Sequence, residues 1–201
     1  MKKFLLNPCR GGRCSRVALL FMLWSIGWMA AGAVRADTHY VSLSGAHRPP
    51  FVDWADAATN IQAAVDAAED GDAVLVNDGV YETGGYVLHD GLTTRVVVAK
   101  AICLKSVNGA EWTTIRGEGP LGPNAVRCVY LSTNAQLAGF TITNGHTLTR
   151  SASISLPQFE GGGVFADGPV VISDCILSGN RAAAIGGGVR FRSEGVADRC
   201  V

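Results

Sequence analysis

Short alternations of apolar and polar residues recur along the chain and are separated by glycine, asparagine and other turn residues. A period of two residues is typical of strands with one buried face. The pattern predicts strands over residues 38–43, 72–76, 95–98, 101–105, 113–116, 126–131 and 136–143, with two more after residue 160. Asn108-Gly109, Asn144-Gly145 and Gly179-Asn180 tolerate positive φ, so we expect the chain to change direction there.

One segment has the period of a helix instead. Its apolar residues recur at i, i+3, i+4 and i+7: Ile61, Ala64, Val65 and Ala68. Thr59 and Gln62 have the spacing of a capping box, and Gly71 is expected to end the helix. We expect this amphipathic helix to lie over the open end of a stack of strands. There it would cover backbone groups that could otherwise recruit another chain.

The segment 161–201 is nearly a duplication. Gly161-Gly162-Gly163-Val164 returns as Gly186-Gly187-Gly188-Val189, and Cys175 returns as Cys200, with a shift of 25 residues in both cases. Repeats of this length that are rich in glycine and β-branched residues indicate coils of short strands stacked on one another. Because one coil cannot bury its own apolar side, neighbouring coils are expected to share a continuous core.

The same frame extends backwards through an earlier and longer coil. With a shift of 35 residues, Leu137 falls on Ile172 and Phe140 falls on Cys175. The ten additional residues fit within the polar stretch 147–160. The sequence therefore predicts the register of three consecutive coils and the position of one insertion.

The first 36 residues differ from the rest of the chain. Their basic residues surround an apolar run at 17–34, and Val34-Arg35-Ala36 places short side chains where a signal peptidase recognises them. This pattern predicts a secretory signal peptide, residues 1–36, that is cut after Ala36. A retained N-terminal anchor is the alternative, because an apolar run of 18 residues is just long enough to span a bilayer.

Removal of this leader changes the charge balance. Six of the 17 Lys and Arg residues lie in the leader and none of the 17 Asp and Glu residues does, which leaves 11 basic against 17 acidic residues. The remaining chain has a formal charge near −6 rather than zero. We therefore do not expect nucleic acid or an anionic membrane to be its main partner.

The cysteines leave two possibilities open. Cys9 and Cys14 belong to the leader, and the spacing of the other four is not that of a metal site. Cys175 and Cys200 share a repeat position, so their Cα atoms should lie ~4.8 Å apart, the spacing of paired strands. That separation permits a disulfide. A ladder of free thiols packed as small apolar groups is the interpretation that we favour.

The motif Gly71-Asp72-x-Val74-x-Val76-x-x-Gly79-x-Tyr81 resembles the opening coil of right-handed parallel β-helix proteins of the pectin-lyase-like superfamily. Residues 57–65, residues 139–145 and the two Gly-Gly-Gly-Val coils are similar to a narrower group, the large secreted repeat proteins of the polymorphic outer-membrane and autotransporter-adhesin type. The resemblance covers residues 40–201. It implies an all-β, right-handed parallel β-helix (solenoid) with an N-terminal amphipathic capping helix. It implies no single activity, because lyases, hydrolases, esterases and inert surface proteins share this fold.

The resemblance also says which side chains to consider for chemistry. Polysaccharide lyases of this superfamily place Asp or Glu around calcium with an Arg or Lys as base, and its hydrolases use neighbouring aspartates as acid and base. The candidates in this chain are Asp167, Asp174, Asp198, Arg190, Arg192 and Arg199. One coil apart, Asp167 aligns with Arg192 and Asp174 with Arg199, the pattern of a compensating surface ladder. We therefore predict no catalytic role for them.

Three glycine-containing motifs also have simple structural explanations. Asp70-Gly71-Asp72 and Asn77-Asp78-Gly79 lack the residue order of a calcium loop and predict turns. Gly161-Gly162-Gly163 lacks the Lys-Ser/Thr pair and the helix start of a phosphate loop. Close approach of neighbouring coils explains these three glycines.

The histidines and aromatic residues are the remaining candidates. The four histidines are isolated and each is expected at the surface: His39, His47, His89 and His146. The aromatic residues that could stack on sugars are Trp54, Tyr81, Tyr86, Trp112 and Tyr130. We expect Trp54 to pack under the helix and Tyr81 to close the first coil.

These observations predict a signal peptide at 1–36, an N-terminal strand and capping helix at 37–71, and β-helix coils at 72–201. The expected protein is a secreted or cell-surface rod, structural or adhesive, that presents loops to glycans or partner proteins, with no catalytic, cofactor-binding or metal residue in this segment. After signal cleavage no membrane insertion is expected. The alternative is the N-terminal part of a polysaccharide lyase or glycoside hydrolase with its site downstream. Because the second repeat stops at Val201, one residue after Cys200, we expect the chain to be the front of a longer protein.

Overall fold

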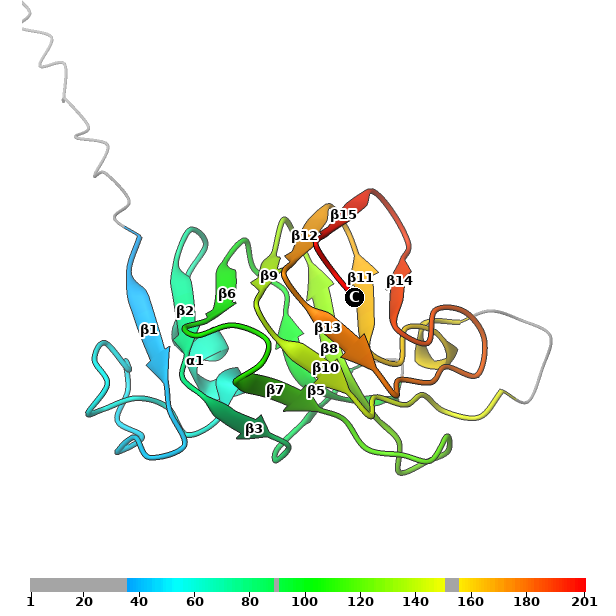
Figure 1. Ribbon diagram of the computed structural model, residues 1–201, viewed down its shortest axis with the longest axis horizontal. Coiled ribbons are helices and arrows are strands. Elements are labelled where there is room, and N and C mark those ends of the chain that lie inside the picture. The colour runs from blue at the N-terminus through cyan, green and yellow to red at the C-terminus, as the bar shows by residue number, and fades with distance from the viewer. Residues whose placement is uncertain (1–35, 89–90, 151–155) are drawn as a thin grey trace, which may run out of the picture. The chain divides into compact units, whose positions relative to one another are not determined.

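The computed structural model describes residues 36–88, 91–150 and 156–201. In this part of the chain, short parallel strands wind into a β-helix of about four turns (Figure 1). Three sheets, named A, B and C below, take one strand each from successive turns. The predicted all-β, parallel β-helix class is therefore confirmed. The predicted leader lies outside the described residues, apart from Ala36.

Sheet A has six strands in the order β1-β2-β6-β9-β12-β15. Their bounds are β1 Thr38–Val41, β2 Ala73–Val76, β6 Cys103–Ser106, β9 Gln136–Ala138, β12 Val170–Ser173 and β15 Gly195–Asp198. All five pairings between them are parallel. Every neighbouring strand therefore comes from the next turn of the β-helix.

Sheets B and C complete each turn. Sheet B contains β3 Gly79–Tyr81, β7 Thr113–Arg116, β10 Thr141–Thr143 and β13 Ile176–Ser178. Sheet C contains β4 Tyr86–Val87, β5 Thr93–Val98, β8 Val126–Ser132, β11 Val164–Asp167 and β14 Val189–Phe191. β4 is antiparallel to β5 and lies at the edge of sheet C. Two helices are also described, α1 Ile61–Ala67 and the 3-10 helix η1 Pro157–Phe159.

The registers predicted from the repeat are confirmed. Val164 pairs with Val189, 25 residues later, and Leu137 pairs with Ile172, 35 residues later. The isolated bridge between His146 and Arg181 keeps the 35-residue frame, so the additional residues lie between that bridge and Gly161. This location matches the predicted insertion at 147–160. The insertion lengthens a loop and leaves the strand pairing on both sides intact.

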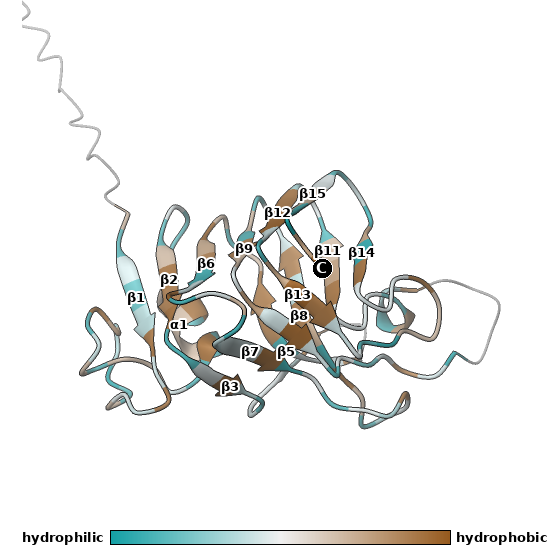
Figure 2. Ribbon diagram, in the orientation of Figure 1, coloured by the Kyte–Doolittle hydropathy of each residue, from teal (hydrophilic) through white to brown (hydrophobic). Residues whose placement is uncertain are grey.

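The core is built from ladders of apolar side chains at equivalent positions. In sheet A, Val74, Leu104, Leu137 and Ile172 are paired in succession and have no exposed surface. Alternate residues of each strand point inward, as the burial of every second residue in β1 and β2 shows. Figure 2 shows the apolar residues concentrated in the strands and the polar ones in the connecting loops. Hydrophobic burial between turns therefore sets the register as well as the stability.

Helix α1 lies at the N-terminal end of the stack, where it contacts β1, β2 and β5. Its buried residues are Ile61, Ala64 and Val65, as the apolar spacing predicted. Two details of the prediction are wrong. The N-cap is Asn60, whose side chain accepts from the Ala63 N–H at 2.8 Å, because the Thr59 hydroxyl contacts His47 Nδ1 instead. The helix also ends at Ala67, before Gly71.

Two side chains form hydrogen bonds with backbone groups at this end of the stack: Gln62, which belongs to α1, and Lys100, which follows β5. The Gln62 amide binds both polar groups of Val97 in β5, accepting from its N–H at 2.7 Å and donating to its carbonyl at 3.2 Å. Lys100 Nζ donates to three carbonyls at the C-terminal end of the helix, those of Val65, Asp66 and the C-cap residue Ala68, at 2.6–3.1 Å. Both ends of the helix are therefore satisfied by side chains.

The predicted strand over residues 136–143 is divided in the structure. β9 and β10 belong to sheets A and B, and the chain turns between them at Gly139, which has a φ of +77°. Asp174 and Arg199 occupy the equivalent position in the next two turns and have φ of +53° and +48°. The alternation runs through this corner without interruption, so the pattern of apolar residues alone does not reveal it. β3 and β4 also have no counterpart among the predicted strands.

Candidate functional site

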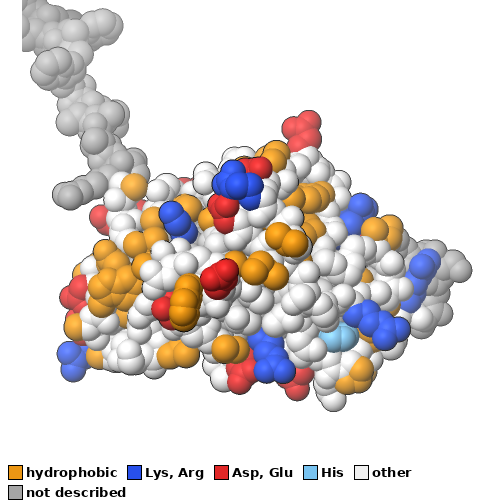
Figure 3. Space-filling view, viewed as in Figure 1, with side chains coloured by type: hydrophobic (Ala, Val, Ile, Leu, Met, Phe, Trp, Pro, Cys, Tyr) orange, Lys and Arg blue, Asp and Glu red, His pale blue; other side chains and the backbone are white. Residues whose placement is uncertain are grey.

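The charged residues singled out from the sequence form ladders between successive turns. Arg192 lies 3.4 Å from Asp167, and Arg199 binds Asp174 through two nitrogens at 2.6 and 2.9 Å. Arg199 also contacts its neighbour Asp198. On the face shown in Figure 3, basic side chains at the top and bottom of the view adjoin acidic ones. The predicted charge compensation is thus confirmed for both pairs.

The Asp174 carboxylate is poorly suited to acid catalysis. A general acid at neutral pH needs a raised pKa. The hydrogen bonds from Arg199 instead lower the pKa of Asp174. Asp174 is therefore ionised and paired, and its geometry supports a role in holding two turns together.

Arg190, the remaining candidate, takes part in a cluster that the sequence did not suggest. Its Nε donates to Glu160 at 2.8 Å, and Glu160 is buried. The fully buried Arg127 donates to the carbonyls of Gly161 and Glu160, both at 2.9 Å, and lies over the ring of Phe165. This cluster ties the end of the 147–160 insertion to β8 and β14. No repeat partner or motif marks Arg127, so its role follows from tertiary contacts alone.

The expectation that every histidine lies at the surface is wrong for His39. His39 is 5% exposed, and its ring nitrogens lie 2.7 Å from the Pro50 carbonyl and 3.2 Å from Asp72 Oδ2. The partners of His39 are a backbone carbonyl and a carboxylate, and neither is the hydroxyl or thiol that a Ser-His-Asp type of triad needs. His47 is exposed and His146 is half-buried, while His89 lies outside the described residues.

The aromatic candidates are dispersed. Trp54 does not pack under the helix: it is 42% exposed and meets Tyr40 edge-on, with ring centroids 4.6 Å apart. Tyr81 closes the first coil as predicted, since it is buried and its hydroxyl donates to the Asn77 carbonyl at 2.9 Å. The exposed Trp112 and Tyr86 come from a loop and from β4. Within the described residues, the aromatic side chains do not form a stacking platform for sugars.

The motifs considered above as metal or phosphate sites take part in structural contacts. Asp70 accepts from the Ala101 N–H at 2.9 Å, and Asp78 accepts from the Asn108 amide at 2.9 Å. In the described part of the chain, no group of three His, Cys, Asp or Glu side chains could hold a metal ion. A Cβ on Gly162 would overlap the Arg181 carbonyl, and one on Gly163 would overlap the Gly188 carbonyl. Close approach of coils therefore explains Gly162 and Gly163. The prediction is wrong for Gly161, which has a φ of +61° and where a Cβ would meet Val164 and Phe165 of its own coil.

The described cysteines are free thiols. Cys175 is fully buried and Cys200 half-buried. They lie one turn apart, since the Val201 N–H donates to the Cys175 carbonyl at 3.0 Å. Burial raises the pKa of Cys175 to about 11 and that of Cys128 to about 12. These thiols are therefore protonated and act as small apolar groups, as the favoured interpretation of the ladder expected.

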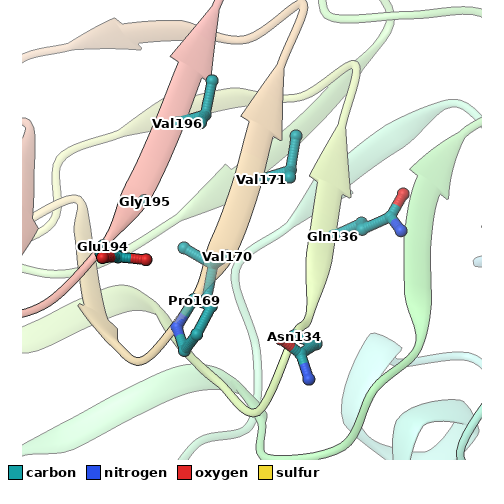
Figure 4. Close-up of a pocket in the computed structure, with 8 residues that line it drawn as sticks. All are labelled: Asn134, Gln136, Pro169, Val170, Val171, Glu194, Gly195 and Val196. Atoms are coloured by element: carbon teal, nitrogen blue, oxygen red, sulfur yellow. The ribbon is translucent and has the colours of Figure 1, made fainter.

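An open groove with a volume of about 330 Å³ lies on the outer face of sheet A (Figure 4). Its lining residues are Asn134, Gln136, Pro169, Val170, Val171, Glu194, Gly195 and Val196. Gln136, Val171 and Val196 occupy one register position in β9, β12 and β15. Figure 4 shows them side by side on neighbouring strands, with Asn134, Pro169 and Glu194 along the end where the strands begin.

The groove combines an apolar floor with a few polar groups. Val171 and Val196 are 42% and 56% exposed, although both belong to strands. The amides of Asn134 and Gln136 offer donors and acceptors, and the Glu194 carboxylate offers acceptors. Such an arrangement offers a ligand apolar contact together with hydrogen-bonding groups. The shifts of 35 and 25 residues already align Gln136 with Val171 and Val196, and Asn134 with Pro169 and Glu194. Only the fold shows that these two rows line one groove.

No family model matches this chain, and neither the curated proteins nor the solved structures gave a significant match. Of the resemblance seen in the sequence, the part that the structure shows is the parallel β-helix fold. Among the described residues, no helix has the length and apolar character needed to cross a membrane.

Proposed function

We propose that this chain belongs to a secreted or cell-surface β-helix with a structural and adhesive role, and that the sheet A groove binds an extended segment of a partner protein. The observation that carries this proposal is the row Gln136–Val171–Val196, which repeats across three turns and leaves two valines exposed. Exposed apolar side chains with a polar rim have the composition of a protein interface.

The chemistry of the groove favours a protein segment over a glycan. Sugars bind well to flat aromatic faces, and the residues that line the groove include none. The one charged residue that lines the groove is the acidic Glu194, so the groove offers no basic side chain to a polyanion. The β-helix also holds the three strands in fixed register, which limits the entropy lost on binding.

A matched pair of variants tests the proposal. Residues 37–201 would be screened against a displayed library of extended peptides and against an array of neutral and acidic oligosaccharides. Selected peptides should lose at least about tenfold in affinity, or about 1.4 kcal/mol, for Val171→Lys. They should bind Val107→Lys as they bind the wild type, because Val107 is 44% exposed but lies outside the groove.

Two results would contradict this assignment. Peptides that bind Val171→Lys and Val107→Lys equally well would show that the groove is not the binding surface. Oligosaccharides that bind the wild type and lose affinity for Val171→Lys would replace the protein partner with a glycan.

A further inference from the structure

The first residues of the β-helix are held by a buried carboxylate. The backbone nitrogen of Asp37 donates to Asp72 Oδ1 at 2.7 Å, and the Ala73 N–H donates back to the Asp37 carbonyl at 2.9 Å. From Thr38 onward the chain pairs with β2 in regular parallel register. Asp37 is therefore the residue at which the chain enters sheet A.

Asp72 is only 7% exposed, and its carboxylate contacts three nitrogen atoms: the backbone nitrogens of Asp37 and Glu69 and a ring nitrogen of His39. The Glu69 N–H donates to Oδ2 at 2.8 Å, and His39 Nε2 lies 3.2 Å from the same oxygen. Burial acts to raise the pKa of Asp72, but the bonds from Glu69, Asp37 and His39 outweigh it and lower the pKa. The carboxylate is therefore a buried anion that is stabilised by donors.

His39 adds to this arrangement through its second ring nitrogen. Nδ1 lies 2.7 Å from the Pro50 carbonyl oxygen, which only accepts, while Nε2 faces the Asp72 carboxylate. Both contacts are complete hydrogen bonds when both ring nitrogens carry protons. His39 thus links the Pro50 carbonyl and the Asp72 carboxylate through its two ring nitrogens.

The neighbourhood is nevertheless strongly acidic. A cavity of about 280 Å³ adjoins Asp72, and four carboxylates line it: Asp37, Glu69, Asp70 and Asp72. His39 is the one basic side chain among its lining residues. A further cation at the Asp37 nitrogen would therefore meet a favourable field.

Signal cleavage after Ala36 would create a cation at that nitrogen. Water hydrolyses the Ala36–Asp37 peptide bond on a signal peptidase: the leader leaves with the new α-carboxylate of Ala36, and Asp37 keeps the nitrogen as an α-ammonium group. The atom that now donates to Asp72 as an amide then donates as a charged group. A cut one residue earlier would move the charge by about 3.5 Å along an extended chain.

We propose that the Ala36–Asp37 bond is the processing site of this protein and that the α-ammonium group of Asp37 forms an ion pair with Asp72, which locks β1 onto β2. Two independent observations meet at this bond: the Val34-Arg35-Ala36 pattern and the position of the Asp37 nitrogen. The inference rests on export, which is part of the proposed function, and is independent of the groove.

The first experiment locates the cut. The full chain with its leader is expressed in a secreting bacterial host, and the exported product is identified by N-terminal sequencing and intact mass. We expect a product that begins at Asp37. A product that begins elsewhere overturns the processing site, and a product that retains Met1 also contradicts export.

The second experiment tests the ion pair. Chains that begin at Asp37 and at Ala36 are compared by urea unfolding, alone and combined with Asp72→Asn. The additional residue should lower the folding equilibrium constant about fivefold to tenfold, since charge-assisted hydrogen bonds are about twice as strong as neutral ones. In the Asp72→Asn variant, the additional Ala36 should change the folding equilibrium constant less than about twofold. Asp70→Asn is the matched control, because Asp70 lines the same cavity but binds Ala101.

A chemical readout keeps the test valid if Asp72→Asn does not fold. The α-amine of the chain that begins at Asp37 should react with an amine-specific ester at least about tenfold more slowly than the amine of the chain that begins at Ala36, because the paired amine is protonated and shielded. Equal rates would overturn the ion pair while leaving export and the cleavage site intact.

Discussion

At the N-terminal end of the stack, strand edges meet side chains and loops, whereas the strands of the last turn are half-buried or exposed. The edge of β1 is covered by residues 51 and 58, since the Tyr40 N–H donates to the Phe51 carbonyl and the Ala58 N–H donates to the Tyr40 carbonyl. The edge of β5 is covered by β4 and by Gln62. In the last turn, all residues of β15 are exposed and those of β14 are half-buried.

The same repeat position therefore has different energetics in different turns. Val164 has no exposed surface, while Val189, its partner in the next turn, is half-buried. Ile172 is fully buried, and its partner Ala197 is exposed. The burial of a residue in a β-helix thus depends on the turns on both sides of it. A repeated motif does not by itself guarantee a repeated contribution to stability.

The largest expected effect compares one leucine in a middle strand of sheet A with one in β13, the strand at the edge of sheet B. Leu104 lies between Val74 and Leu137 and is fully buried, so Leu104→Ala should cost about 2–5 kcal/mol of unfolding free energy. Leu177 in β13 is only partly buried, and Leu177→Ala should cost about 1 kcal/mol. Urea unfolding measures both variants, and equal losses of unfolding free energy would contradict the expected difference between these two positions.

The next effect concerns the helix that closes the N-terminal end. Lys100→Met removes three charge-assisted hydrogen bonds to the carbonyls at the end of α1, so the unfolding free energy should fall by about 2 kcal/mol. Lys105→Met is the control, because Lys105 is exposed on sheet A. Thermal and urea unfolding measure both variants. If Lys105→Met were as destabilising as Lys100→Met, the contacts with the helix could not be the cause.

A smaller effect is expected where a side chain takes the place of a strand. Gln62→Glu replaces the donor that faces the Val97 carbonyl with an acceptor, while the volume stays nearly the same. The loss should be about 1 kcal/mol. Gln136→Glu makes the same chemical change at an exposed position and should leave the unfolding free energy nearly unchanged. A neutral Gln62→Glu would show that this end of sheet C does not depend on the amide.

The smallest effect is expected for the exposed ladder of the last turns. Arg199→Gln removes the hydrogen bonds that lower the pKa of Asp174, so NMR titration should show that pKa rising toward its usual value near 3.8. Because the folded-state pKa is depressed, the contribution to stability is present above the unfolded-state pKa and is lost as the pH falls through the folded-state value. The change in unfolding midpoint should be small and should disappear in 1 M salt. An unchanged Asp174 titration would rule out the pair in solution.

Much of the fold follows from local sequence pattern. The shifts of 25 and 35 residues specify which strands pair, because equivalent apolar residues must stack to be buried, and the structure has Leu137 on Ile172 and Val164 on Val189. The charge ladder could be predicted for the same reason, since Asp167 and Arg192 share a repeat position. The location of the insertion at 147–160 followed from counting alone.

Other features depended on contacts between distant segments. Thr59 has the side chain of an N-cap, but His47 engages it and Asn60 caps the helix instead. His39 looks like a surface residue in the sequence, yet the return of the chain at Asp72 and Pro50 buries it.

The groove shows the same division between sequence and fold. Repetition places Gln136, Val171 and Val196 in one row and Asn134, Pro169 and Glu194 in a second row. The fold decides that both rows line one groove on the outer face of sheet A. Periodicity determines which residues stack, because stacking is a nearest-neighbour property of each turn. Which side chains meet at the corners and at the ends depends on how loops of different length return to the stack, and that is a property of the tertiary structure.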